Sequence, residues 1–385
     1  MSRTRVWQAG FVVGAAAGAI VTVAGRRAEE RARAGLVDWG AVERIAEGRL
    51  RGAHGRLSAA EIAATEPAYA AAMARVVPAL ERSLGVPLPG IVDRVAVVDR
   101  AAWVRANMVS FADLFGRLEG PLLDQLVPPG AGLAKATIAL ANRWVSTRQF
   151  GYLLGFMGQR VLGQYDLALL SAEAAPGQLL FVEENIRATA ASLGVALDPF
   201  RTWIALHETT HAFEFEAHPW LRPYIAERLE RQLAAFSRSS STLGRDTSQA
   251  LRRALRGGDG HWLERLMSDE QRRLFRETQT LMALLEGFGD HVMDSAGASI
   301  VPGVATISER FHARRNSRSP VERAILRITG LDLKMEQYAR GERFVAGIER
   351  LAGPAALRRL WDGPASLPRE DELATPERWV RRVMT

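Results

Sequence analysis

A run of twelve residues, Ile204–Phe215 (IALHETTHAFEF), constrains this chain more than any other stretch. It holds His207, Glu208 and His211 in the order H-E-x-x-H. On a helix, two histidines four residues apart lie one turn apart on the same face, so both imidazoles can reach one zinc ion. The glutamate beside the first histidine can then contact a water at the metal. The rest of the fold must hold this helix and complete the zinc shell.

The residues before the motif predict a helix with a buried face. Asp198 is expected to be the N-cap, and Pro199 falls where a first-turn proline is tolerated. Phe200, Trp203 and Ile204 precede the two histidines at helical spacing, which places the histidines on the apolar face. Histidines on such a face can be ordinary core residues. Two of them at ligand spacing, with a glutamate between, favour a metal site instead.

The third zinc ligand must come from another part of the chain. In the pattern H-E-x-x-H-x-x-G-x-x-H a third histidine would fall at Ala217, and Glu214 stands in the place of the glycine. The better candidate lies in Leu281–Asp294 (LMALLEGFGDHVMD), which predicts a helix. Its Glu286 is surrounded by leucine and phenylalanine, so we predict that Glu286 points inward and is the third ligand.

Residues next to this glutamate have predicted supporting roles. Asp290 follows four residues later and is expected to orient a zinc-binding histidine through its second ring nitrogen. Gly287 and Gly289 carry no side chains and would let two helices approach closely enough to share the metal. Two further histidines stay open as ligands. His291 points about 100° away from Asp290 on a helix, and His218 misses the three-histidine pattern by one residue.

Two histidines and one glutamate leave a coordination position for water. Glu208 would accept the proton of that water as it attacks a carbonyl, and would pass it to the leaving group. The motif therefore predicts a zinc-dependent hydrolase, most simply a metallopeptidase that cleaves a peptide or amide bond. The alternative is a non-catalytic scaffold or regulatory module whose fold is stabilised by zinc and which could be tethered to a membrane. For the oxyanion, Tyr224, His218, His261 and His312 stay open.

Composition narrows the metal chemistry. The chain has no cysteine, which excludes disulfides, thiolate zinc sites, iron–sulfur clusters and thiol catalysis. The formal charge of +7 could suggest an anionic partner, but Lys135 and Lys334 are the only lysines among 50 basic residues. The arginines are dispersed among acidic residues without aromatic interleaving, so we predict no nucleic-acid partner.

The N-terminus carries an uncharged run, Ala9–Gly25. As a helix it would span about 25 Å, which is short of the ~30 Å hydrocarbon core of a bilayer. An anchor, a cleaved signal and an apolar helix packed on the protein all stay open. We expect a cytoplasmic protein, with membrane association through residues 9–25 as the alternative. We also expect residues 1–35 to form this segment and an arginine-rich linker, and residues 36–385 to form one metallohydrolase domain. The oligomeric state is left open.

The remaining sequence predicts a mainly helical α+β fold with a small sheet. Asp38 is expected to cap a helix ending near Arg51, and Ser58 with Glu61 forms a capping box. Pro67 and Pro78 are expected to break or kink the helical stretch that follows. Periodicity predicts further helices over Arg100–Gln125 and Leu133–Arg148, and strands over Ile91–Val98, Tyr152–Val161 and Gln178–Val182. The last of these, QLLFV, is expected to be an edge strand that could pair with an extended substrate.

Taken together, several of these segments resemble the zincin-like type 2 metallopeptidase family. They are ALHETTHAFEFEAHPWL, YLLGFMGQRVLGQYDLALL, QLLFVEENI, VDWGAVERIAEGRL and EGFGDHVMD. The resemblance covers about Val37 to Met384 and is strongest to hydrolases named for association with biosynthesis of a deazaflavin coenzyme. It implies a mostly helical zincin-like core with a small sheet beside the active-site helix. It also implies His207, His211 and Glu286 as zinc ligands and Glu208 as general base, and it supplies no substrate.

Overall fold

The computed structural model describes residues 26–128, 130, 132–166, 177–232, 267–316 and 333–384. The segment Ala9–Gly25 lies outside these residues, so its membrane contact stays a prediction. Across the described ranges, no helix combines the length and the apolar character needed to cross a membrane. The chain divides into two compact units. Unit 1 is Met1–His54 with Arg100–Arg160, and unit 2 is Gly55–Asp99 with Val161–Thr385. The boundary expected after residue 35 stays a prediction.

Unit 1 contains three long helices: α2 (Trp39–Leu50), α5 (Arg100–Leu126) and α6 (Gly132–Gly158). The side chain of Asp38 accepts a hydrogen bond from the Ala41 amide and caps α2, as predicted. The strand predicted over Tyr152–Val161 is wrong, because α6 continues through Gly158. The glycines of this stretch explain the error. A Cβ at Gly151 would lie 2.7 Å from the Cβ of Ile45, so this side of α6 is shaped for close contact with α2.

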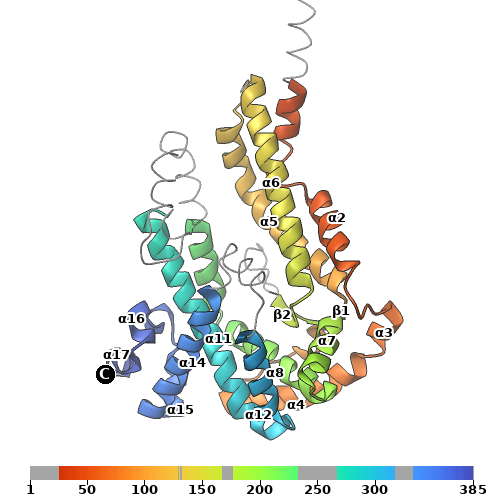
Figure 1. The fold of residues 1–385 in the computed structure, drawn as a ribbon. Helices are drawn as coiled ribbons and strands as arrows, with labels where there is room; N and C mark the ends of the chain where they lie inside the picture. Colours follow the sequence, from red (N-terminus) through yellow and green to blue (C-terminus); the bar gives the residue numbers. More distant parts are fainter. Residues whose placement is uncertain are drawn as a thin grey trace, which may run out of the picture. The chain divides into compact units, whose positions relative to one another are not determined.

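Unit 2 contains most of the helices and one small sheet, and the predicted mainly helical α+β fold is confirmed. Its described helices include α3 (Ala59–Ala63), α4 (Glu66–Leu84), α7 (Glu183–Leu193), α8 (Leu197–Glu216), α11 (Asp269–Ile300), α12 (Val304–Asn316), α14 (Leu333–Ala352), α15 (Pro354–Arg359), α16 (Glu370–Leu373) and α17 (Pro376–Met384). Its strands are β1 (Val95–Val98), β2 (Gly163–Asp166) and β3 (Gln178–Val182). Helices α11 and α14 run side by side (Figure 1).

The sheet has the order β1-β3-β2, with β3 parallel to β1 and antiparallel to β2. The strand predicted over Gln178–Val182 is confirmed, but its predicted place at the edge is wrong. Its last four residues are buried, and both of its backbone edges are paired with a neighbour. An uninterrupted apolar run is typical of a strand in the interior of a sheet. The strand predicted over Ile91–Val98 is shorter than expected and begins at Val95.

The capping box of Ser58 and Glu61 is present at the start of α3. Pro67 lies in the first turn of α4, where a missing backbone N–H costs little. We expected a break or a kink at Pro78; the break is wrong, because α4 continues past it to Leu84, and the kink stays a prediction. Six apolar or aromatic side chains of α4 are buried. The free energy gained by burying them outweighs the loss of one backbone hydrogen bond at Pro78.

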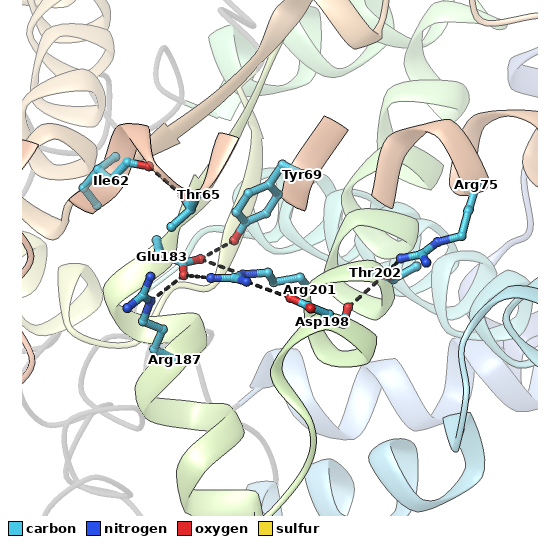
Figure 2. Close-up of polar contacts among 9 residues, drawn as sticks. All are labelled: Ile62, Thr65, Tyr69, Arg75, Glu183, Arg187, Asp198, Arg201 and Thr202. Atoms are coloured by element: carbon cyan, nitrogen blue, oxygen red, sulfur yellow. Dashed lines mark hydrogen bonds and ion pairs between the residues drawn. The ribbon is translucent and has the colours of Figure 1, made fainter. Parts of the chain in front are cut away.

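Helix α8 lies in the core of unit 2 and packs against α4, α11, β2 and β3. The predicted N-cap is wrong: Ala196 is the cap residue, and Asp198 lies in the first turn. The physical reason is a competing partner, since the Asp198 carboxylate accepts a hydrogen bond of 2.8 Å from Arg201. Figure 2 shows Arg201 between Asp198 and Glu183.

Glu183 ties three helices together. It is fully buried at the start of α7 and accepts hydrogen bonds from Tyr69 on α4 (2.7 Å), from Arg187 (2.6 Å) and from Arg201 on α8 (Figure 2). Burial alone would raise the pKa of this carboxyl group, but the three hydrogen bonds outweigh burial and lower it. This network fixes the N-terminal half of α8, the helix that carries the H-E-x-x-H motif.

Candidate metal centre

Helix α8 presents His207 and His211 from one face. Both histidines are half-buried, whereas the residues around them on the helix are mostly buried. The two Nε2 atoms are 3.2 Å apart, and the ring planes are nearly perpendicular at 81°. Four-residue spacing on a helix accounts for this approach, since it places the two side chains one turn apart.

Helix α11 brings Glu286 to the same point. Its Oε2 lies 3.9 Å from the Nε2 of His207. His207, His211 and Glu286 each offer one possible ligand atom, and every two of these three atoms lie within 4.8 Å of each other. Zinc bonds of about 2.1 Å in a tetrahedron put ligand atoms roughly 3.4 Å apart. Two imidazoles and one carboxylate at these separations therefore fit a zinc ion, and the spacing leaves room for a fourth ligand.

Two glycines of α11 have different neighbours. A Cβ at Gly289 would lie 3.5 Å from atoms of both imidazoles, so this glycine lies directly against the histidine pair, as expected. The same expectation is wrong for Gly287. A Cβ there would lie 2.2 Å from the carbonyl carbon of Gly341, so Gly287 serves the crossing of α11 with α14.

Glu208 lies beside the ligand set with only 7% of its surface exposed. It packs against β2, where a Cβ at Gly163 would lie 2.6 Å from the Glu208 Cγ and 2.8 Å from its Oε1. Glycine at position 163 is therefore required for the glutamate to occupy this place. A buried carboxylate held next to a metal site is suited to accept and return a proton.

Glu214 is a site residue that the sequence reasoning missed. Its Oε2 lies 2.8 Å from the Nδ1 of His211, and the residue is fully buried. Donation of the Nδ1–H to this carboxylate leaves the lone pair on Nε2, which is the tautomer that a metal ligand needs. The signal was present in the sequence. An acid three residues after a histidine on a helix lies on the same face as that histidine. The three-histidine pattern instead treats position 214 only as the place of a glycine.

The carboxylates give this site a strongly negative environment. Burial alone would lower the pKa of His211, but the charge of Glu214 and its hydrogen bond, with help from Glu286 and Glu208, raise it to about 10. Burial raises the pKa of Glu214 to about 7, against the opposing effect of His211. Such surroundings favour a cation at the position that faces the three ligand atoms.

The sequence match covers most of the chain. A model of the zincin-like metallopeptidases matches residues 37–380. The chain belongs to this family. A solved structure described as a candidate hydrolase with a novel fold, from Chloroflexus aurantiacus, is 35% identical in sequence, with a TM-score of 0.66. The similarity covers 90% of this chain and 98% of the other. A search of curated proteins gives no match.

The second ring nitrogen of His207 has a sulfur neighbour. Its Nδ1 lies 2.9 Å from the Sδ of Met293 on α11. Asp290 is half-buried on the same helix. Its predicted role of orienting a histidine stays a prediction.

The other residues that the sequence left open as ligands or oxyanion stabilisers have other contacts where they fall among the described residues. The Nδ1 of His218 is 2.8 Å from the Glu214 carbonyl oxygen, and its ring stacks on Trp361, which matches a structural role. His291 contacts Glu349 at 3.3 Å. Two oxyanion candidates also have other contacts: the guanidinium of Arg228 lies 3.3 Å from the ring centre of Tyr224, and His312 lies 3.4 Å from Ser308. His261 lies outside the described residues.

Proposed function

We propose that this protein is a zinc-dependent hydrolase that cleaves a peptide or amide bond. His207, His211 and Glu286 would hold the ion, and Glu208 would act as general base. The observation that carries the proposal is the convergence of three ligand atoms from two helices within 4.8 Å of one another. Membership of the metallopeptidase family supports the same reading.

A bound zinc ion would supply Lewis acidity toward the substrate carbonyl and toward water. The Glu208 carboxylate would transfer the proton. Glu208 accepts a proton from the attacking water and delivers it to the leaving nitrogen, so that amide and water become acid and amine. Its burial against Gly163 holds the carboxylate in place and excludes bulk water from one side.

The substrate class is supported by the sheet as well as by the family. Within the described residues, β2 pairs on one side only, with β3, and its Gly163 contacts Glu208. An extended peptide could add to the other side of β2 through backbone hydrogen bonds. The association with deazaflavin coenzyme biosynthesis stays a hypothesis from the resemblance and names no substrate.

The ligand set is tested by metal content. We expect purified wild-type protein to bind one zinc per chain, and His207→Ala and Glu286→Ala to lose most of it, because two ligands hold zinc far less tightly than three. Metal analysis by mass spectrometry, with circular dichroism as a check of folding, measures this. Full zinc occupancy in a folded Glu286→Ala protein would remove Glu286 from the ligand set.

The catalytic role is tested separately with Glu208→Gln. This variant should keep its zinc and lose turnover by roughly 10²- to 10⁴-fold, as is typical for loss of a general base. A library of peptides and small amides, assayed on the zinc-loaded protein, provides the measurement. If zinc is bound and the whole library is left uncleaved by wild type, the non-catalytic scaffold becomes the better account.

A further inference from the structure

The outer face of α6 in unit 1 is unusually apolar for a surface. Five of the nine large apolar side chains that are exposed in the described chain lie on this helix, so the exposure is concentrated in one place. Ile138 is 63% exposed, Trp144 60%, Tyr152 49% and Val145 42%. Exposed apolar side chains that gather on one helix indicate a surface of interaction.

Three of these side chains form one line along the helix. Ile138, Val145 and Tyr152 are separated by seven residues each, and seven residues return to within about 20° of the same direction on an α-helix. A neighbouring side of α6 is already used, because its buried Gly151 and Gly155 pack against α2. The helix is therefore apolar on two sides, and only one of them faces its own unit.

Guanidinium groups lie over the two aromatic rings of this face. The Arg148 guanidinium is 4.5 Å from the ring centre of Trp144, and that of Arg49 is 5.2 Å from the ring centre of Tyr152. An aromatic ring and a long cationic side chain that share one level suit the boundary between acyl chains and headgroups, where one end of each side chain is apolar and the other is solvated.

The charge of unit 1 has one dominant sign. No acidic residue lies between Asp124 and Asp166, a stretch that includes all of α6. Unit 1 has 16 basic and 8 acidic residues, a net charge of +8. The whole chain has 50 and 43, so unit 2 has 34 and 35, a net charge of −1. The net positive charge of the chain therefore belongs to unit 1, which has few acidic residues, while the basic residues themselves occur in both units.

We propose that the outer face of α6 docks on the surface of an anionic lipid bilayer. Ile138, Val145 and the two aromatic rings enter the interface, and Lys135, Arg148 and Arg49 contact the headgroups. Apolar burial and attraction to anionic lipid together give the binding energy of such faces. A second copy of the chain fits this face less well, since pairing two α6 faces would bring their cations together. The proposal is independent of the hydrolase function and of residues 9–25.

The cysteine-free sequence allows a position-specific test. We would introduce Val145→Cys in the full chain and label it with a nitrobenzoxadiazole dye, whose emission shifts to the blue when it enters an apolar environment. The reference is Leu351→Cys, which places the same dye on an exposed position of unit 2. Vesicles of phosphatidylglycerol should shift the emission at position 145 and leave it unchanged at position 351. Vesicles of phosphatidylcholine should shift neither dye.

Arg148→Glu in the labelled protein changes the face by two charges and should weaken vesicle binding on the order of tenfold. Ile138→Ser is a second, uncharged variant that should weaken vesicle binding as well. Circular dichroism would check that both variants remain folded.

Three outcomes would overturn the proposal. Vesicle sedimentation of the protein without a shift at position 145 would assign membrane binding to another segment. A shift that grows with protein concentration in the absence of vesicles would identify a second copy as the occupant. Equal shifts on both lipids would remove the anionic surface as the partner.

Discussion

At the scale of single residues, the candidate site depends on which nitrogen of each histidine carries the proton. A histidine can ligate a metal through Nε2 only when its remaining proton is on Nδ1. For His211 the partner that holds this proton is Glu214, and for His207 the neighbour at Nδ1 is Met293. The two histidines of one motif thus have different neighbours at Nδ1, a carboxylate for His211 and a thioether sulfur for His207.

Glu214→Gln should weaken zinc binding by roughly 10- to 100-fold, which is the usual effect of removing an outer-shell partner of a ligating histidine. The glutamine keeps an acceptor for the Nδ1–H but loses the negative charge. Competition with a chromogenic chelator measures the affinity.

The matched control is Glu216→Gln, two residues further along α8. Glu216 pairs with Arg94 at 2.5 Å and accepts a hydrogen bond from Tyr165 at 2.7 Å, and it is not part of the metal group found in the described chain. Its loss should reduce stability and leave zinc affinity unchanged. Equal zinc affinity in Glu214→Gln and wild type would show that Glu214 does not position His211.

At the scale of elements, the site depends on close approaches at two glycines. A Cβ at Gly163 on β2 would overlap side-chain atoms of Glu208 on α8, the nearest at 2.6 Å. The approach of α11 to α14 is equally tight, since a Cβ at Gly341 would lie 1.8 Å from the carbonyl oxygen of Ala283. The first contact positions Glu208, and the second holds the helix that carries Glu286.

Gly163→Ala should lower turnover while zinc content stays near that of wild type. The new methyl group would displace the Glu208 carboxylate, since the three atoms nearest to a Cβ at position 163 all belong to Glu208, and the candidate ligands His207, His211 and Glu286 would stay in place. Steady-state kinetics and metal analysis on the same preparation separate the two effects. Loss of zinc together with activity would show instead that the substitution disturbs the whole centre.

Gly341→Ala should destabilise the protein by about 3 kcal/mol, the upper part of the range for overpacking, because its new neighbours are backbone atoms that cannot rotate away. Gly116→Ala on α5 is the control, since a Cβ there meets nothing within 4 Å. That substitution should stabilise its helix by roughly 0.5–1 kcal/mol through the better helix propensity of alanine. Chemical denaturation of both variants provides the comparison.

At the scale of the whole molecule, stability should depend on the buried network around Glu183. The folded-state pKa of Glu183 is lowered, so the carboxylate form stabilises the fold. The sign follows directly. The contribution is fully present above the ordinary glutamate pKa of about 4.3 and is lost as the pH falls through the lower folded-state pKa. The free energy of unfolding should therefore decline steeply on the acid side.

Glu183→Gln should reduce stability at neutral pH by about 3–5 kcal/mol, because the buried Arg201 loses the one of its two carboxylate partners that is itself buried. It should also make the acid decline shallower, since the titrating group is gone. Denaturant unfolding at a series of acid pH values measures both effects. Asp198→Asn serves as the control, because the Asp198 side chain is 73% exposed and its pair with Arg201 is screened by water. An acid decline of unchanged steepness in Glu183→Gln would assign it to other carboxylates.

Local spacing in the sequence was sufficient for several features of this protein. The helix that carries His207, Glu208 and His211, the cap at Asp38 and the capping box at Ser58 follow from contacts within one turn of chain. The absence of cysteine restricted the ligands to imidazole and carboxylate. Glu286 could also be proposed from its apolar surroundings, because an acid at that position of a helix faces inward.

Only the tertiary structure decided the rest. It placed Gly287 against α14, Gly163 against Glu208 and β3 between two other strands. It also turned the stretch after Arg148 from a predicted strand into the end of α6. In each case the deciding contact joins segments that are far apart in sequence, whereas periodicity reports only neighbours within a few turns of the same element.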